Sequence, residues 1–156
     1  MSVHNYSVED ATLEDALLMA HRMRDVDKQE IWASNRSRPL EALVNSVRYS
    51  ESARTGRADG EIVCMCGVSR QNLMGTRGCI WLLGTDLLKR HGIRFLRENN
   101  KEIVDLSENF TIIENYCDAR NTATLRWLGW LGFTIEKAKP YGIYNLPFHH
   151  FHKEVA

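Results

Sequence analysis

The stretch that decides the fold is Asn121-Thr-Ala-Thr-Leu-Arg-Trp-Leu-Gly-Trp-Leu-Gly-Phe133, near the end of a chain of 156 residues. Its pattern predicts a helix over 121–131 that ends at Gly132, because glycine readily adopts the left-handed conformation that closes a helix. Phe133 then begins a strand, and we expect its ring to fill the core. Apolar runs at 110–117 and 133–137 predict a strand on each side of this helix.

Further helices and strands are predicted on the N-terminal side of this unit. Thr12 suits the start of a helix that continues from Leu13 to Met23, and Pro39 suits the first turn of a second helix. This second helix is expected to end before a turn at 56–60, and a long helix is predicted over 85–108. Segment 25–37 is either a short helix or a loop. The remaining strands are predicted at 3–8, 61–69, 78–83 and 144–153, with a hairpin at 71–77 and a turn at Pro140 and Gly142.

Composition indicates an ordinary globular protein with a single domain over 1–156. The 20 Lys and Arg residues balance the 20 Asp and Glu residues, and 44% of the residues are apolar. Neutral overall charge argues against a dedicated nucleic-acid binder, and no apolar run is long enough to span a membrane. The start of the chain lacks the pattern of a signal peptide, so we expect a cytoplasmic protein. The four cysteines lie in apolar segments and are expected to be buried thiols.

Five positions in the quoted stretch carry a resemblance. Asn121, Thr124, Leu128, Gly132 and Phe133 fill the pattern Asn, two residues, a small residue, three residues, Tyr, three residues, Gly-Phe, with leucine in place of tyrosine. Together with the predicted order of elements, this segment resembles the GNAT N-acetyltransferase family. The resemblance implies an α+β fold of GNAT type, with a mixed, mostly antiparallel central sheet and helices on both faces.

Two departures from the family pattern weigh against catalysis. In active members the tyrosine protonates the departing thiolate of coenzyme A, which Leu128 cannot do. The family's Gly-rich phosphate loop is matched best by Lys89-Arg-His-Gly92-Ile-Arg94, where one glycine remains, and Asp86 places a negative charge where a phosphate should dock. We therefore expect no cofactor, with acetyl-CoA as the alternative. If acetyl-CoA binds, the resemblance assigns its contacts to Leu83, Gly84, Arg90, Gly92, Arg94 and Asn121.

A narrower resemblance concerns the source of the chain. Trp81-Leu-Leu-Gly-Thr-Asp86, Asn115-Tyr116 and the stretch 121–133 are similar to GNAT-like proteins of tailed bacteriophages, among them the small internal virion protein family of short-tailed phages. This resemblance implies a virion-associated protein, in the internal core or ejection apparatus or in assembly, built on a degenerate acetyltransferase scaffold. It implies a location in the host cytoplasm and the virion, with other virion proteins or a second copy as partners. The alternative function is an acetyl-CoA-dependent N-acetyltransferase.

Other residues suggest individual roles. Tyr116 and Glu114 are weak catalytic candidates if the chain is an enzyme, as proton donor and general base respectively. Trp130, Phe148 and Phe151 are expected to contact a partner, because rings flanked by polar residues are typical of interface centres. His150 and His152 would share one face of a strand, but no third ligand is fixed by spacing, so no metal site is predicted.

Overall fold

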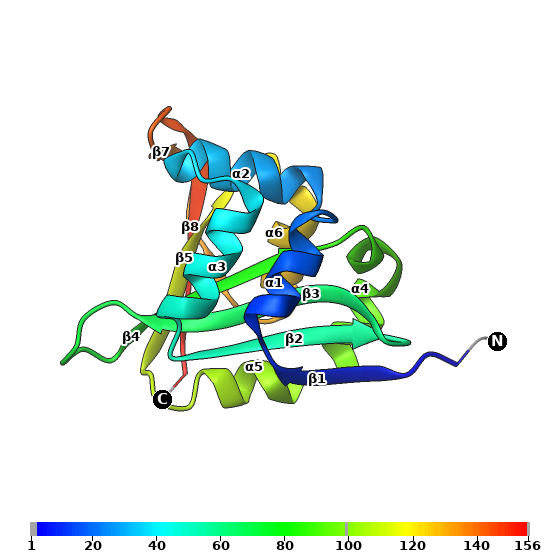
Figure 1. Ribbon diagram of the computed structural model, residues 1–156. Coiled ribbons are helices and arrows are strands. Elements are labelled where there is room, and N and C mark those ends of the chain that lie inside the picture. Colours follow the sequence, from blue (N-terminus) through cyan, green and yellow to red (C-terminus); the bar gives the residue numbers. More distant parts are fainter. Residues whose placement is uncertain (1–2, 99, 156) are drawn as a thin grey trace.

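The structure, a computed structural model, describes residues 3–98 and 100–155. Figure 1 shows the elements in this part of the chain, and their order is as follows. They are β1 (Tyr6–Asp10), α1 (Leu13–Ala20), α2 (Asp25–Asn35), α3 (Pro39–Tyr49), β2 (Ser52–Ala58), β3 (Glu61–Arg70), β4 (Arg77–Gly84), α4 (Leu87–Glu98), α5 (Asn100–Leu106), β5 (Ile112–Asp118), α6 (Thr122–Trp130), β6 (Thr134–Ile135), β7 (Lys139–Tyr141) and β8 (Leu146–Glu154).

One sheet organises the described residues. Its strands follow the order β1-β2-β3-β4-β5-β8-β6, with β7 also paired to β8. Every pair is antiparallel except β4 and β5, which run parallel. Helices α1 to α3 cover one face of the sheet, and α4 to α6 cover the other (Figure 1). The predicted α+β fold, with a mixed, mostly antiparallel sheet between helices, is confirmed.

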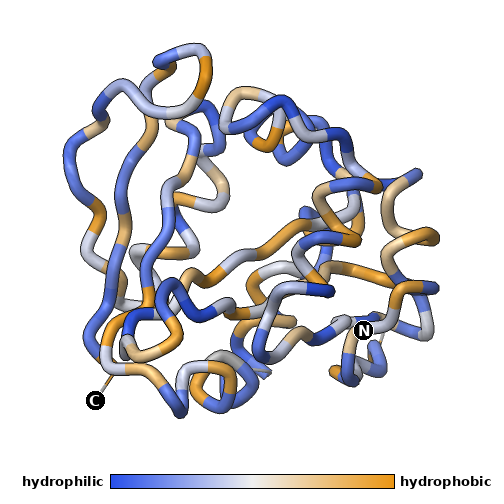
Figure 2. The backbone as a smooth tube through the Cα atoms, turned by 60° about the vertical axis from the view of Figure 1, so that its left-hand side comes forward, coloured by the Kyte–Doolittle hydropathy of each residue, from blue (hydrophilic) through white to orange (hydrophobic). Residues whose placement is uncertain are grey.

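The apolar core is divided between the two faces of this sheet. Leu43 of α3 and Ala16 of α1 pack with Met65 of β3 on one face, while Leu88 and Phe95 of α4 pack on the other. Figure 2 shows that the central strands carry long hydrophobic stretches, whereas hydrophilic residues alternate with hydrophobic ones along the helices. This pattern is expected for strands that are covered on both faces by amphipathic helices.

The segment from Asn121 to Phe133, a helix followed by the start of a strand, folds as predicted. Asn121 caps α6 by accepting a hydrogen bond from the Thr124 N–H, and Gly132 has a φ of +91°. The Phe133 N–H donates to the carbonyl of Leu128 at 3.0 Å, which closes the helix. The Phe133 ring is 7% exposed and meets the ring of Phe151 edge-on at 5.3 Å. The expectation that Phe133 fills the core is confirmed.

Several predicted elements differ from the structure. Segment 25–37, which the sequence left open, forms α2, and the predicted helix over 85–108 is described as α4 and α5, with residue 99 outside the described residues. The turn predicted at 56–60 begins inside strand β2. The sequence pattern did not predict this strand. The reason lies in packing, because a Cβ at Gly56 would overlap the ring of Phe95. This glycine is required by a close contact within the sheet rather than by a turn.

The predicted interface on β8 is wrong for two of its three rings. Phe148 and Phe151 are 2% and 6% exposed, because Phe151 packs against Phe133 in the core and Phe148 packs against the ring of Tyr141. Trp130 is 57% exposed at the end of α6, so its role in partner contact stays a prediction. Among the described helices, none has the length and hydrophobicity needed to cross a membrane.

Candidate functional site

The parallel strands β4 and β5 separate after a short paired segment. Their ladder joins Arg77 to Ile112, Gly78 to Ile113 and Cys79 to Glu114, and it goes no further. Beyond this point the Asn115 side-chain amide donates to the Ile80 carbonyl at 2.7 Å, across the opening between the strands. Two parallel strands that diverge in this way leave backbone groups without ladder partners. We call this opening the β4–β5 gap.

The register of β4 determines which backbone groups face the gap. The Thr85 N–H donates to the Val63 carbonyl at 2.9 Å, so every second residue of β4 bonds to β3. By this alternation, Leu82 and Gly84 direct their N–H and C=O groups toward the gap. Gly84 is paired there with α2, because its N–H donates to the Asp27 carboxylate at 2.8 Å. Leu82 therefore offers an amide N–H and a carbonyl oxygen to a bound molecule.

A cavity of about 300 Å³ passes through the sheet at the gap. Its walls come from both faces of the sheet, since α2 and α3 contribute on one side and α6 contributes on the other. The lining residues used below are Glu30, Ser34, Asn35, Ser37, Asn45, Ser46, Trp81, Leu82, Tyr116, Thr124, Trp127, Leu128 and Tyr141. A cavity lined from both faces of the sheet can hold parts of two molecules next to each other at the gap.

Glu30 of α2 is the titratable side chain that is best placed in this cavity. Its carboxylate accepts a hydrogen bond of 2.7 Å from the Asp118 N–H, at the carboxyl end of β5. Burial, helped by the neighbouring charge of Asp27, raises the pKa of Glu30 to about 7. A carboxyl group with a pKa near neutrality exchanges protons readily at physiological pH, which suits it to general acid–base catalysis.

Glu30 was not among the residues that the sequence pattern predicted for the site. The residue lies in segment 25–37, which is polar and gave no clear helical period, and nothing local links it to the end of β5. A sequence signal exists in hindsight, because Asp27 and Glu30 are three residues apart and share one side of a helix. Recognising their role requires the tertiary contact that brings α2 over the gap.

Arg24 and Asp27 hold the start of α2 against the gap. The Arg24 Nε donates to the Asp27 carboxylate at 2.8 Å, and the Arg24 guanidinium also reaches the Thr124 hydroxyl of α6 at 3.2 Å. Asp27 is buried, and burial raises its pKa. The same guanidinium lies 5.5 Å from the ring centroid of Trp127. These contacts tie α2, β4 and α6 together around the cavity.

The two predicted catalytic residues differ in their relation to the cavity. Tyr116 lines it, half exposed, and its ring stacks on that of Tyr141 with centroids 4.0 Å apart. Glu114 is absent from the lining, and its carboxylate contacts the Arg77 Nε at 2.6 Å and the His150 Nε2 at 2.9 Å. The hydrogen bond from Arg77 lowers the pKa of Glu114. Glu114 is therefore a structural ion-pair member, and Glu30 replaces it as the candidate base.

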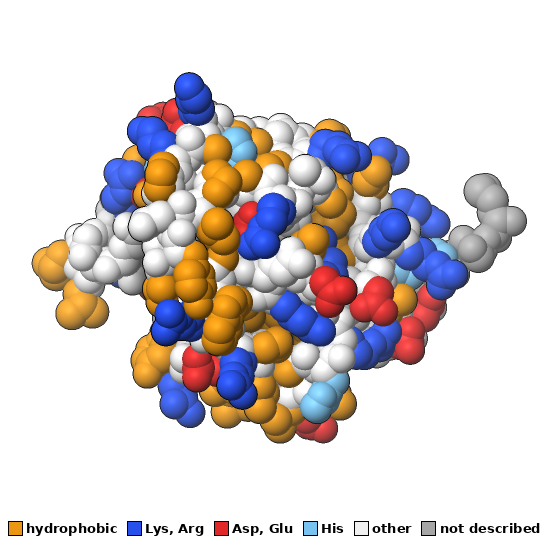
Figure 3. Space-filling view, turned by 90° about the horizontal axis from the view of Figure 1, so that it is seen from above, with side chains coloured by type: hydrophobic (Ala, Val, Ile, Leu, Met, Phe, Trp, Pro, Cys, Tyr) orange, Lys and Arg blue, Asp and Glu red, His pale blue; other side chains and the backbone are white. Residues whose placement is uncertain are grey.

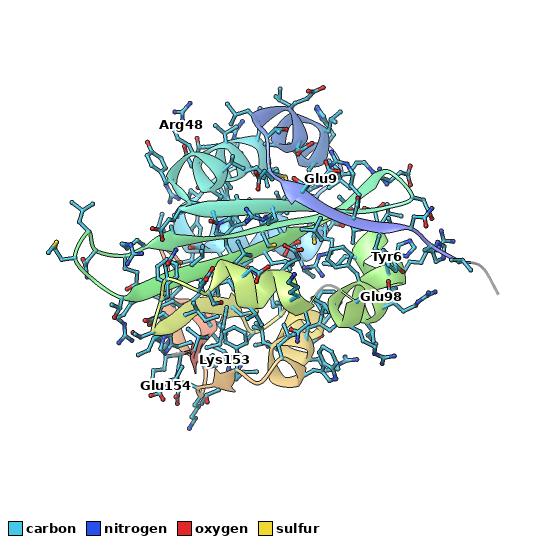
Figure 4. All side chains as sticks on the ribbon, turned by 90° about the horizontal axis from the view of Figure 1, so that it is seen from below. Tyr6, Glu9, Arg48, Glu98, Lys153 and Glu154 are labelled. Carbon is cyan, nitrogen blue, oxygen red and sulfur yellow. The ribbon has the colours of Figure 1, made fainter. Side chains whose placement is uncertain are left out.

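Segment 89–94, the best match to the family's phosphate loop, lies within α4, in agreement with the helix predicted over 85–108. Gly92 lies within α4 and faces α6, where an added Cβ would come within 2.7 Å of the Trp127 ring. Arg94 lies over the ring of Tyr6, 5.9 Å from its centroid, and 3.9 Å from the Glu98 carboxylate, and Figure 4 labels both neighbours. Gly92 thus serves helix packing, and Arg94 serves the contact between α4 and β1.

The start of α4 satisfies its own backbone. The Leu87 N–H donates to the Thr85 hydroxyl at 3.3 Å, and the Leu88 N–H donates to the Thr85 carbonyl at 3.0 Å. The Lys89 N–H donates to the Asp86 carbonyl at 3.2 Å. Bound phosphate at this end would therefore depend on side-chain cations. Lys89 and Arg90 are exposed there, and neither makes an ion pair within the described residues.

The packing role of Gly92 gives a stability prediction. We expect Gly92→Ala to lower the free energy of unfolding by about 1–3 kcal/mol, because the new methyl group overpacks against Trp127. Gly129→Ala is the matched control, since the nearest atom to its added Cβ is 4.0 Å away, on Ile135. That variant should gain up to about 1 kcal/mol from helix propensity. Urea unfolding of both variants measures the difference, and equal stabilities would contradict the packing role.

One buried polar atom next to the cavity has no partner. The Asn121 side chain is 2% exposed and its oxygen caps α6, but its Nδ2 amide makes no hydrogen bond within the described residues. Unsatisfied buried donors are rare because each one is unfavourable. Asn121 immediately precedes the turn that carries Thr124 and Trp127 into the cavity wall. A ligand carbonyl at this place would satisfy the amide.

Solved structures with the same arrangement of strands and helices identify the fold. An acetyltransferase of the GNAT family from Streptococcus pneumoniae matches 97% of this chain and 100% of its own, with a TM-score of 0.64 and 15% identity. The chain has the GNAT fold. The putative acetyltransferase yncA from Salmonella typhimurium, solved with acetyl-CoA, matches 97% of this chain and 95% of its own, with a TM-score of 0.71 and 12% identity.

A third neighbour of the GNAT fold is spermidine N-acetyltransferase from Vibrio cholerae in complex with CoA and spermine. It matches 96% of this chain and 95% of its own, with a TM-score of 0.69 and 12% identity. The expectation of no cofactor is contradicted by these neighbours, because structures of this fold hold acetyl-CoA or CoA. The sequence itself matches no protein-family model and no curated protein.

Proposed function

We propose that the chain is an N-acetyltransferase of GNAT type that transfers an acetyl group from acetyl-CoA to an amine. The observation that carries this proposal is the cavity through the β4–β5 gap, with Glu30 in its wall. Because the cavity is lined from both faces of the sheet, we place the donor against α6 and the acceptor against α2 and α3, so that they meet at the gap. GNAT-fold neighbours bound to acetyl-CoA and to CoA support the choice of donor.

The residues around the gap fit the pantetheine arm of the donor. When bound, acetyl-CoA supplies an acetyl thioester with a good leaving group. Leu82 offers its N–H and C=O to an amide-bearing arm, and Asn121 offers the unpaired Nδ2 amide. Trp127 and Leu128 give this side of the cavity an apolar wall. At the outer end, the exposed side chains of Lys89 and Arg90 would neutralise phosphates by charge.

Glu30 supplies the proton chemistry on the acceptor side. An aliphatic amine is protonated at neutral pH and must lose a proton before its nitrogen can attack a carbonyl carbon. The Glu30 carboxylate, with a pKa of about 7, can accept that proton directly or through a water molecule. The hydrogen bond from the Asp118 N–H orients the carboxylate at the gap. The base is therefore held where the two molecules would meet.

A proton is also needed by the departing thiolate. Leu128, at the position where the family pattern has tyrosine, carries no proton to give and is buried. The phenols that line the cavity are those of Tyr116 and Tyr141. Burial raises the pKa of Tyr141, so this phenol stays protonated and available as a donor. The role of Tyr116 as proton donor stays a prediction.

The test of the proposed function combines donor binding with turnover. Titration calorimetry with acetyl-CoA should show saturable binding, and Asn121→Ala should weaken it by roughly tenfold through loss of one hydrogen bond to the buried amide. Release of free CoA thiol in the presence of an amine should follow. Thr122→Ala is the control on the same helix, because Thr122 is exposed whereas Asn121 is buried with an unpaired amide. Absence of both binding and amine-dependent thiol release would refute the proposal.

The virion reading rests on the narrower sequence resemblance alone. It would place the protein in the host cytoplasm and in particles, with other virion proteins or a second copy as partners. The exposed Trp130 is the one predicted interface ring that remains on the surface of the described residues. Detection of the protein in purified particles would test this reading, which is compatible with an acetyltransferase activity.

A further inference from the structure

We propose, on the basis of the proposed function, that the acceptor is a monoamine on a hydroxyl-rich scaffold, such as an amino sugar, and not a polycationic amine. The inference comes from the wall of the cavity on the side of α2 and α3, which we call the acceptor wall. Ile31 and Ala42 supply its apolar lining, and its polar lining residues are Glu30, Ser34, Asn35, Ser37, Asn45 and Ser46. Five of these six polar side chains are neutral hydroxyl or amide groups.

Much of the hydrogen-bonding capacity on the acceptor wall is unused. Among the described residues, the side chains of Ser37, Asn45 and Ser46 make no hydrogen bond. Asn35 uses its oxygen to accept from the Ser37 N–H at 3.1 Å, and its amide nitrogen remains available. Asn45 and Ser46 lie side by side on the face of α3 that is turned to the cavity. Small neutral groups that both donate and accept match the hydroxyl groups of a polyol.

Two aromatic rings complete the acceptor side of the cavity. Trp81 is fixed by a hydrogen bond of 2.7 Å from its Nε1 to the Ser50 hydroxyl. Tyr141 is held by its stacking on Tyr116. Rigid aromatic walls with a few polar groups are typical of sites for small molecules with both apolar and polar faces. A sugar ring has such faces, because its C–H groups and its hydroxyl groups point in different directions.

Charge on the acceptor wall argues against a polycation. Glu30 is the one acidic side chain in this part of the lining, and it is assigned to the reacting amine. Figure 3 shows Lys and Arg side chains interspersed with Asp and Glu on this face. The other carboxylate in the cavity lining, that of Glu102, belongs to α5 and not to the acceptor wall. A second ammonium group bound along the acceptor wall would therefore find neutral groups and no carboxylate besides Glu30.

The closing experiment compares acceptors with the full-length protein and acetyl-CoA. Glucosamine represents the hydroxyl-rich monoamine, spermidine the polycation, and a lysine-containing peptide the extended chain. We expect kcat/KM for glucosamine to exceed that for spermidine and for the peptide by at least about tenfold. Preference for spermidine or the peptide overturns this inference and leaves the proposed function in place. No turnover of any amine, together with no binding of acetyl-CoA, refutes the proposed function and this inference with it.

A double variant tests whether the acceptor wall itself sets this preference. Asn45→Ala/Ser46→Ala should raise KM for glucosamine about tenfold more than it raises KM for butylamine, which has no hydroxyl groups. Arg48→Ala is the matched control, because Arg48 is exposed on the same helix and absent from the cavity wall. Thermal melting of each variant confirms that it is folded. An equal rise in KM for both amines, or none for either, contradicts recognition of hydroxyl groups by α3.

Discussion

Glu30→Gln is expected to lower kcat/KM for amine acetylation by about 10²- to 10⁴-fold, the usual contribution of a general base. The amide of glutamine cannot accept a proton from the ammonium group, whereas its size and shape match those of glutamate. Its side-chain oxygen can still accept the hydrogen bond from the Asp118 N–H, which measures 2.7 Å in the structure. The measurement is steady-state release of CoA thiol at saturating acetyl-CoA, with binding of acetyl-CoA as a separate readout that should stay unchanged.

The stability of the same variant provides the control for folding. Because burial raises the pKa of Glu30 from 4.5 to about 7, the folded protein keeps a proton that the unfolded chain releases. Stability from this group is fully present below pH 4.5 and is lost as the pH rises through about 7. At pH 8 the wild-type protein holds a buried charge that glutamine removes. The variant should therefore unfold at the same temperature as the wild type, or higher, at pH 8.

The pH dependence of the reaction follows from the same group. The base must be deprotonated to act, so kcat/KM in the wild type should rise with pH and level off above about 7. In Glu30→Gln this rise should disappear, because the titrating group is absent. A variant that is folded, keeps full activity and retains the wild-type profile would remove Glu30 from the role of base.

Much of the fold could be predicted from local patterns. The strands β3, β4 and β5 are apolar runs in the sequence. Helix α6 is bounded by two residues that commonly mark helix ends, Asn121 at its start and Gly132 after its end. Patterns of this kind report which residues are buried, and burial decides the element. Strand β2 was missed because its sequence, Ser-Ala-Arg-Thr-Gly-Arg-Ala, has little apolar character. Its place in the sheet depends on pairing with β1 and β3, which no short window reveals.

The candidate site was predicted less well, for a physical reason. Leu82 and Glu30 line the cavity from elements that are far apart in the sequence, and Thr124 of α6 lines it as well. Asn121 begins α6 as the predicted helix over 121–131 implies, because capping is a local interaction. The resemblance implied a cofactor contact for Gly92, and the structure shows that this glycine allows the approach of Trp127. A glycine in the sequence indicates a position where a side chain would be unfavourable, but it does not indicate which neighbouring group lies close to it.

Phe148→Ala is expected to lower the free energy of unfolding by about 3–5 kcal/mol, the cost of removing a fully buried aromatic ring. The ring is 2% exposed and lies 5.1 Å from the ring centroid of Tyr141. Alanine would leave a cavity between β8 and its neighbours, and β5 pairs with β8 at this position through Asp118. Because Asp118 also donates its N–H to Glu30, we expect the loss to spread to the site.

Trp130→Ala separates this core role from a surface role. Trp130 is also an aromatic residue, but it is 57% exposed at the end of α6, so its removal should change stability by no more than about 0.5 kcal/mol. Urea unfolding of the two variants, with thermal melting as a second probe, gives both free energies. If Trp130→Ala lowered the free energy of unfolding more than Phe148→Ala, the Phe148 ring would lie on the surface and the placement of β8 in the sheet would be wrong. If Phe148→Ala is the more destabilised variant, as expected, it should also lose acetylation activity because β5 loosens. Trp130→Ala should keep this activity.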